Sequence, residues 1–520
     1  MKDPHMRFAE LFAGIGGLGL GLEQADLQPL TGYERWDKAV DVWQFNNKSK
    51  AFKIDLGNVA EAALHIMGAS PQMIVGGPPC QDFSEAGKGI LGENAAMTQA
   101  YAMIIAIVRP EWFVFENTRR APLSLNYRQA RTIWKRAGYG LSEILLDASY
   151  YGTPQSRKRF FCIGRLCEVD GFLDSAIIEA ASKRQVPVRS VLDPDRFPDD
   201  AELIRRGGYF VRPYTGGKGV HRLDRPAPTI IHTSTGRPNK AYRDNPHPTD
   251  HMPYDEAFQL TAHQAMRIQG FPADFEIVGT QRLKKGKDSY AKHDTMQMIA
   301  NAVPPPLAEK IGEVILARAE GRSIPALDAG FQAFLLERFP PKEDEAQKPK
   351  RKQKGKPEKA QISPNMANIK SRVNRARRLL HGRTYQDIAL ELAELEDTAE
   401  FASLDVRTKS DLRAALRLYH EYMSSRPLSK YARKIEKLEK GEKPKPVVPD
   451  FGRRPHAADG SPTDVAPSES SGATRLRRRY APQTPADEPS DFHVDVGPDL
   501  DPRHEPDVKP SDSDRLVRDE

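Results

Sequence analysis

The first 320 residues alternate short, densely apolar runs with segments of helical periodicity. Apolar runs bounded by polar or turn residues predict buried strands at residues 7–12, 30–33, 73–75 and 111–115. Segments with one apolar face predict helices ending at Gln24 and spanning residues 101–108, 260–269 and 307–318. Residues 166–220 show neither period, and we expect them to be irregular. Strands that alternate with helices predict an α/β fold.

Glycines and acidic residues follow the predicted strands. Ala13-Gly14-Ile15-Gly16-Gly17-Leu18 leaves the first strand, and such a turn lets a ligand approach the backbone and a helix N-terminus. Glu34 follows the second strand at a distance suited to ribose hydroxyls, and Asp55 follows the apolar pattern at 52–54. Each acid taken singly fits a solvated surface side chain, but their joint placement favours a nucleotide-like ligand.

The most distinctive stretch is Gly76-Gly77-Pro78-Pro79-Cys80, directly after a predicted buried strand. Glycines permit a sharp turn and prolines stiffen it, so Cys80 is expected at a rigid turn, where a thiol could serve as a nucleophile. The alternative is a small apolar residue in a turn. Glu116 ends the dense strand at 111–115, where desolvation would raise its pKa and suit it to donate a proton. Period-2 alternation places Gln155, Arg157 and Arg159 on one face of a further strand.

Composition narrows the class of protein. Three cysteines cannot form a disulfide framework and lack paired metal spacing, so we expect a reducing cytosol and no metal site. No apolar stretch is long enough to cross a bilayer, and the N-terminus lacks a signal-peptide pattern. A net charge of +7 is compatible with a polyanionic partner.

These motifs together resemble the DNA (cytosine-5) methyltransferases. The resemblance covers residues 7–318 and rests on six ordered motifs: Phe12 to Gly17, Gly77-Pro78-Pro79-Cys80-Gln81, Glu116-Asn117, Gln155-x-Arg157-x-Arg159, Arg225-Pro226-x-Pro228-Thr229 and Asn301-Ala302-Val303. Arg35 is a departure, because the family often has an apolar or aromatic side chain there.

The resemblance implies a Rossmann-like, S-adenosylmethionine-dependent methyltransferase domain with a small target-recognition region. It implies Cys80, Glu116, Arg157 and Arg159 as catalytic residues, and Gln81, Ser84, Asn117 and Gln155 as substrate-binding residues. The implied cofactor-binding residues are Phe12, Gly14, Ile15, Gly16, Gly17, Leu18, Glu34, Asp55, Leu56, Pro78, Asn301 and Val303.

The implied reaction adds the Cys80 thiolate to C6 of a flipped cytosine, so that C5 can take the methyl group of S-adenosylmethionine without a metal. We expect double-stranded DNA as the substrate, a monomeric enzyme, a cytoplasmic, nucleoid-associated location, and a restriction endonuclease as a candidate partner. Alternatives are a tRNA cytosine-5 methyltransferase, a catalytically silent DNA-binding module, and a nicotinamide-dependent oxidoreductase, which leaves the catalytic motifs unexplained.

The expected domains are a catalytic core at 7–165, a variable recognition region at 166–222, and its remainder with the return to the core at 223–320. Beyond these, residues 339–365 predict a basic disordered linker, because residues 348–359 carry seven basic residues and one acid. Helical periodicity at 366–440 predicts a small appendage, and the Pro-, Asp-, Ser- and Arg-rich segment 441–520 predicts a disordered tail.

Overall fold

The structure is a computed structural model that describes residues 6–79, 93–213, 217–278, 290–322, 324, 327, 329–340, 364–425 and 433. Residues 1–445 form one compact unit, and the second unit, residues 446–520, lies outside the described part. Among the helices described, none is long and apolar enough to cross a membrane.

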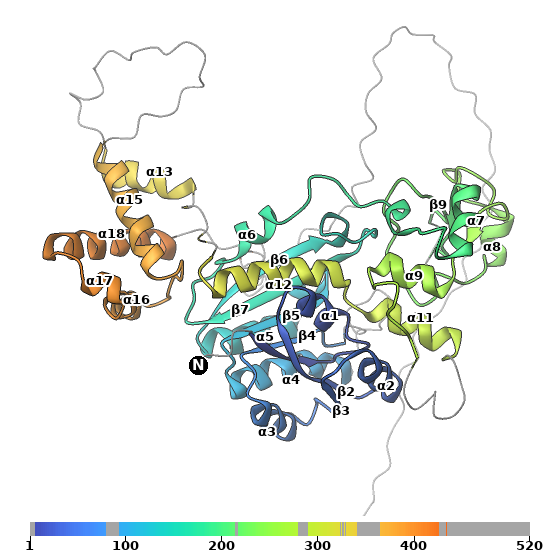
Figure 1. The fold of residues 1–520 in the computed structure, drawn as a ribbon, viewed down its shortest axis with the longest axis horizontal. Helices are drawn as coiled ribbons and strands as arrows, with labels where there is room; N and C mark the ends of the chain where they lie inside the picture. Colours follow the sequence, from blue (N-terminus) through green and yellow to red (C-terminus); the bar gives the residue numbers. More distant parts are fainter. Residues whose placement is uncertain are drawn as a thin grey trace, which may run out of the picture. The chain divides into compact units, whose positions relative to one another are not determined.

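A seven-stranded sheet forms the centre of the compact unit (Figure 1). Its strands are β1 (Arg7–Leu11), β2 (Gln28–Glu34), β3 (Lys50–Lys53), β4 (Met73–Gly76), β5 (Trp112–Thr118), β6 (Tyr139–Asp147) and β7 (Lys158–Leu166). They lie in the order β3-β2-β1-β4-β5-β7-β6, with β7 antiparallel to both neighbours and the other pairs parallel. The chain moves outward from β1 to β3 and returns to β4, so a crevice is expected beyond the carboxyl ends of β1 and β4.

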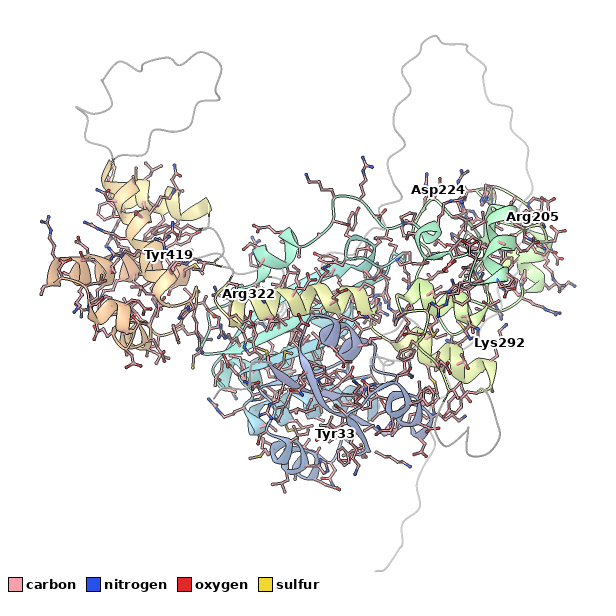
Figure 2. The ribbon with its side chains drawn as sticks, viewed as in Figure 1. Tyr33, Arg205, Asp224, Lys292, Arg322 and Tyr419 are labelled. Atoms are coloured by element: carbon pink, nitrogen blue, oxygen red, sulfur yellow. The ribbon has the colours of Figure 1, made fainter. Side chains whose placement is uncertain are left out.

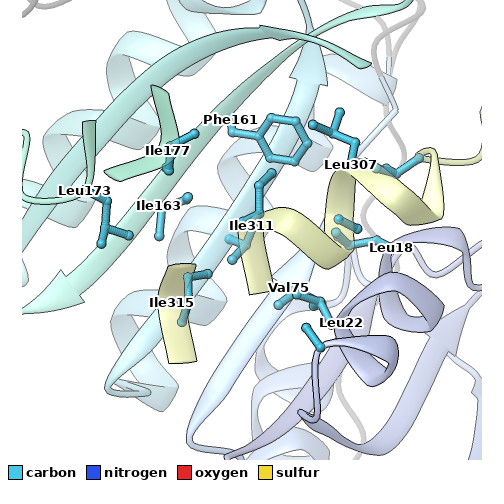
Figure 3. Packing of buried hydrophobic residues seen from close by; sticks show 14 of the residues in the cluster. Leu18, Leu22, Val75, Phe161, Ile163, Leu173, Ile177, Leu307, Ile311 and Ile315 are labelled. Carbon is cyan, nitrogen blue, oxygen red and sulfur yellow. The ribbon is translucent and has the colours of Figure 1, made fainter. Parts of the chain in front are cut away.

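Helices cover both faces of this sheet. Adjacent residues of one strand point to opposite faces, so Val75 packs on one side and Ile74 on the other. On the Val75 side lie α1 (Gly17–Gln24) and α12 (Pro305–Ala319), whose Leu18 and Ile311 join the same apolar cluster (Figure 3). The other face is covered by α3 (Val59–Ala69), α4 (Glu93–Val108) and α5 (Leu125–Arg136), while α2 (Asp37–Asn46) packs near β2 and β3.

The close packing of α1 against α12 depends on small residues. A Cβ placed on Gly21 would lie 2.2 Å from the backbone oxygen of Pro305, so a larger residue would push the helices apart. Through this contact the chain returns, after some 280 residues of other structure, to the beginning of the sheet. The loop that precedes α12 is thereby held beside the glycine turn after β1.

A second, smaller sheet belongs to the region between β7 and α12. Strands β8 (Gly208–Phe210), β9 (Val220–Arg222) and β10 (Phe258–Gln259) form it in the order β10-β8-β9. Around it lie α7 (Pro198–Arg206), α8 (Lys240–Asp244), α9 (Ala262–Gln269), α11 (Lys292–Asn301) and the 3-10 turn η4 (Val188–Val191). A bidentate ion pair between Arg267 and Asp200, with N–O distances of 2.6 and 2.7 Å, ties α9 to α7.

The expectation that residues 166–220 are irregular is wrong in part. This stretch contains α6 (Asp174–Glu179), α7 and β8. Helix α7 has proline in its first turn, acids early, Arg205 and Arg206 late, and Gly207 at a φ of 73° as its C-cap. These are ordinary signals for the start and end of a helix. They lie only nine residues apart, so the helix between them was too short to be recognised from its periodicity. The predicted strands at 7–12, 30–33, 73–75 and 111–115 all overlap strands of the main sheet.

After the α/β unit, the described residues form the helices α13 (Ala329–Arg338), α15 (Pro364–Leu379), α16 (Ile388–Glu396), α17 (Ala399–Ala402) and α18 (Val406–Ser425). We call residues 364–425 the helical appendage. Tyr419 of α18, labelled in Figure 2, packs edge-on against Phe331 of α13 in one of its apolar clusters. The buried carboxylate of Glu168, just after β7, accepts a 2.8 Å hydrogen bond from the backbone N of Thr384 and a 3.3 Å bond from Arg318.

Candidate active site

A cavity of about 720 Å³ opens at the carboxyl ends of β1, β4 and β5. Its lining includes most of the residues that the sequence assigned to a cofactor: Phe12, Gly14, Ile15, Gly17, Leu18, Glu34, Asp55, Leu56, Pro78, Asn301 and Val303. Gly16 is not among the lining residues; it caps α1 at a φ of 88°, and a Cβ there would lie 2.8 Å from Trp43. The sequence motifs therefore converge on one hollow at the switch point of the sheet.

The glycine turn is fixed by the second strand. The backbone N of Gly14 donates a 3.0 Å hydrogen bond to Glu34 Oε2, while Glu34 Oε1 accepts from the backbone N atoms of Arg35 and Trp36. A Cβ on Gly17 would lie 2.4 Å from the backbone oxygen of Val303, so only glycine allows this approach. Three separate segments thus meet at one wall of the cavity. Arg35, which stands where the family often has an apolar or aromatic side chain, lines this cavity next to the aromatic Trp36.

Sequence reasoning missed Glu10, a fully buried carboxyl in the middle of β1 that also lines the cavity. Its oxygens accept hydrogen bonds from the backbone N of Gly19 at 2.9 Å and from Trp43 Nε1 at 3.0 Å. Burial raises the pKa of Glu10 to about 7, against the opposing effect of these two bonds. The signal that could have identified Glu10 in the sequence is an acidic residue among the apolar residues Phe8, Ala9 and Leu11 of a predicted buried strand. Glu10 links β1, α1 and α2 beneath the glycine turn.

Glu116 and Arg159 form an ion pair at the cavity wall. Arg159 Nε lies 3.0 Å from Glu116 Oε1, and the Glu116 side chain is only 10% exposed. Burial raises the pKa of Glu116, and the positive charges of Arg159 and, less strongly, Arg157 counteract that rise. Because burial dominates, this carboxyl keeps its proton to a higher pH than an ordinary glutamate.

The loop after β4 is held against this pair. Asn117 Nδ2 donates a 3.1 Å hydrogen bond to the backbone oxygen of Pro78, and a Cβ on Gly77 would lie 2.7 Å from Glu116 Oε2. Asn117 also lines the cavity. The predicted nucleophile, Cys80, is the second residue after Pro78 in the sequence. Three predicted site residues, Cys80, Gln81 and Ser84, lie outside the described residues.

Arg157 and Gln155 precede β7, so they do not share the strand face that alternation predicted. Arg157 is 2% exposed and lines the cavity, yet its guanidinium donates to the backbone oxygens of Ile230, Ala300 and Ala302. Two of these carbonyls flank Asn301. These bonds hold the loop around Asn301 in place.

The Gln155 amide, predicted to bind substrate, is fully buried and makes its hydrogen bonds within the protein. Its Nε2 donates to Gln269 Oε1 at 2.7 Å, and its Oε1 accepts from the backbone N of Ile230 at 2.9 Å. Gln269 in turn donates to the backbone oxygen of Ala302. This network joins the start of β7, the smaller region and the loop before α12.

Comparison with known proteins agrees with this arrangement. Residues 6–317 match the family model of the C-5 cytosine-specific DNA methylases. The Type II methyltransferase M.HindV of Haemophilus influenzae is 34% identical over 313 residues, covering 60% of this chain and 96% of that protein. The Type II methyltransferase M.HgiDI of Herpetosiphon aurantiacus is 36% identical over 306 residues, covering 58% of this chain and 92% of that protein.

Among solved structures, the S. pombe Dnmt2 methyltransferase aligns with a TM-score of 0.48 at 18% identity, covering 61% of this chain and 99% of that one. The family model spans the main sheet, the cavity and the smaller region, and it ends within α12. On that match, the chain belongs to the C-5 cytosine-specific DNA methylases and is a DNA (cytosine-5-)-methyltransferase.

Proposed function

We propose that this enzyme methylates C5 of a cytosine flipped out of double-stranded DNA, through a temporary bond between Cys80 Sγ and C6 of the base. The observation that carries the proposal is the Glu116–Arg159 pair, which lines the cavity beside the loop running from Pro78 toward Cys80. A cytosine in a stacked duplex cannot bring C5 and C6 into such a hollow, so the base must leave the stack.

The cavity suits S-adenosylmethionine. Its volume of about 720 Å³ falls in the range of small-molecule sites, and the glycine turn at Gly14 and Gly17 keeps side chains out of the hollow. Glu34, placed at the end of β2, would accept hydrogen bonds from ribose hydroxyls, and Asp55 would lie by the adenine end. When bound, this cofactor supplies the electrophilic methyl group. Asn301 and Val303 would complete the wall opposite the glycine turn.

In the proposed reaction the Cys80 thiolate forms a bond to C6 of the base. Glu116 donates its proton to N3 as that bond forms, and electron density moves to C5, which then accepts the methyl group. A water molecule then takes the C5 proton, and the electron pair of that C–H bond returns to the ring, breaks the bond between C6 and Sγ, and releases the thiolate. N3 gives its proton back to the Glu116 carboxylate, which restores the acid. Burial raises the pKa of Glu116, so the carboxyl keeps the required proton to a higher pH than an ordinary glutamate.

Two neighbouring side chains support this step. Arg159, paired with Glu116, would direct its remaining N–H groups at O2 of the base and stabilise negative charge there. Asn117 would fix the position of the loop that leads to Cys80, through its hydrogen bond to the Pro78 carbonyl oxygen. Arg157 we assign as a positioning residue, because its bonds hold the carbonyls on either side of Asn301.

We propose residues 166–222, together with the segment up to α11, as the target-recognition region. Described residues here form their own small sheet and an apolar cluster of Phe210, Val220, Tyr242 and Ala257. Arg189 and Arg196 are exposed and are candidates for base or phosphate contact, whereas Arg205 and Arg206 already pair with Glu202 at 2.6 and 2.7 Å (Figure 2 labels Arg205). Two bacterial relatives are named Type II methyltransferases, which supports a role in restriction–modification.

The test supplies purified enzyme and tritiated S-adenosylmethionine with duplex DNA or with tRNA, followed by bisulfite sequencing. We expect label only in DNA, with bisulfite-resistant cytosines at one sequence. The Cys80→Ala variant should bind the cofactor and transfer nothing. Label in tRNA alone would replace the DNA proposal by the tRNA alternative. Transfer by Cys80→Ala at the wild-type rate would refute the nucleophile.

A further inference from the structure

The helical appendage separates its charges sharply along the chain. Residues 364–383, which form α15 and the turn after it, contain no carboxylate and six basic side chains: Lys370, Arg372, Arg375, Arg377, Arg378 and Arg383. Residues 384–406, which contain α16 and α17, carry no lysine or arginine and seven acids: Asp387, Glu391, Glu394, Glu396, Asp397, Glu400 and Asp405. Helix α18 packs against both α15 and α16 (Figure 1).

Three of the five basic side chains of α15 contact α13 or α18. Arg372 pairs with Asp411 of α18 at 2.7 Å, and the buried Arg377 lies 5.2 Å from the ring centre of Tyr419. Lys370 donates a 3.0 Å hydrogen bond to Gln332 of α13. These three positions stabilise the packing of α15.

The outer face of α15 is different. Asn368, Ser371, Arg375 and Arg378 are all exposed, and their spacing of three, four and three residues places them in one stripe along the helix. Each carries a hydrogen-bond donor, and the stripe bears two positive charges with no carboxylate on the same helix. Arg, Ser and Asn are side chains that contact phosphate oxygens in protein–DNA interfaces. We call these four residues the α15 stripe.

We propose that the α15 stripe binds the phosphate backbone of DNA outside the target site. The polyanion is already the substrate of this family, and the stripe matches it in charge and in donor chemistry. The acidic helices α16 and α17 would be repelled by the same polyanion. The appendage would therefore approach DNA with its basic helix α15 facing the phosphates. In the sequence, the positive charge continues in the twelve residues 348–359.

The stripe contributes affinity and not sequence choice, because phosphate contacts position a protein without reading bases. None of its residues is among those lining the cavity, and the appendage lies beyond residue 317, where the family match ends. The chemistry at the cavity should therefore proceed without it once DNA is saturating.

The test measures binding of the full chain to a long duplex of random sequence across a series of salt concentrations. Arg375→Gln/Arg378→Gln is compared with a control, Arg407→Gln/Arg417→Gln, which removes two exposed charges from α18 of the same appendage. Loss of two phosphate contacts should reduce the slope of log Kobs against log salt by about 1.8 for the α15 variant, and leave it unchanged for the control.

Circular dichroism should show that both variants keep the wild-type helix content, and the methylation rate at saturating DNA should stay at the wild-type value. A wild-type salt slope in Arg375→Gln/Arg378→Gln would overturn the proposal. An equal loss of slope in both variants would overturn it too, since the effect would then follow net charge and not the stripe.

Discussion

Arg157 and Arg159 stand two residues apart, yet the structure gives them different neighbours, so replacing each with lysine should cause different defects. Arg157 uses both terminal nitrogens to reach carbonyls on two segments, at Ile230 and at Ala300 and Ala302. A lysine has a single terminal nitrogen and cannot bridge both segments. Leaving one or two buried carbonyls without their charged donor should lower the free energy of unfolding by about 3 kcal/mol.

The same change should weaken cofactor binding, because the freed carbonyls flank Asn301 in the cavity wall. We therefore expect Arg157→Lys to raise KM for S-adenosylmethionine about tenfold, which corresponds to a loss of about 1.4 kcal/mol of binding energy. Arg159→Lys keeps a positive charge near Glu116 but loses the planar fork, so it should reduce kcat on the order of 100-fold. Its effect on stability should be small, because lysine keeps a positive charge beside the buried Glu116 carboxyl.

Urea unfolding and steady-state kinetics with each substrate varied separate the two variants. Thermal melting with and without S-adenosylhomocysteine shows in addition whether ligand binding still raises the melting temperature of the Arg157→Lys variant. If Arg157→Lys lowered kcat alone, with normal stability and a normal KM for the cofactor, the assignment of Arg157 as a positioning residue would be refuted.

Three further predictions follow from buried carboxyls. Because burial raises the pKa of Glu116, the wild-type methylation rate should fall as pH rises through that pKa. The Glu116→Gln variant should be slow at every pH and show no such fall. An identical pH profile in both proteins would show that Glu116 is not the acid. The pKa of Glu10 is raised to about 7, so the stability it contributes is complete below pH 4.5 and is lost as pH rises to about 7. The unfolding free energy of wild type should fall by about 3 kcal/mol relative to Glu10→Gln across that window, whereas a constant difference would contradict the burial argument. Glu168→Ala leaves Arg318 and the Thr384 amide without their buried acceptor, and should cost about 3 kcal/mol in urea unfolding; a loss below about 0.5 kcal/mol would show that the appendage does not depend on this contact.

The main sheet and much of the cavity wall could be predicted from sequence because their signals are local. Dense apolar runs mark β4 and β5. The glycine at position 14 has a φ of 55°, and the glycine at position 17 stands where a Cβ would lie 2.4 Å from the backbone oxygen of Val303. Glu34 was identified by its distance from the glycine turn, and it does contact Gly14. Motif order added further lining residues, among them Pro78, Asn301 and Val303.

Contacts between distant segments could not be predicted in this way. The side-chain amide of Gln155 could hydrogen-bond either to a substrate or to another residue, and the sequence alone does not decide between them. Its partner in the structure is Gln269, which lies 114 residues away. Glu10 is an acid inside an apolar strand, and only the tertiary structure brings Trp43 and Gly19 to its oxygens. Helix α7 was missed because nine residues hold few periods of its apolar face.

The central claim is that Cys80 bonds to C6 of the target cytosine during methyl transfer, and a mechanism-based trap tests it most directly. Duplex DNA carrying 5-fluorocytosine at the mapped target is incubated with the enzyme and S-adenosylmethionine, because fluorine at C5 cannot leave as a proton does. We predict a covalent complex that forms only with the methyl donor, and whose peptide map places the base on Cys80. Absence of that adduct, under conditions in which ordinary DNA is methylated, would contradict the claim.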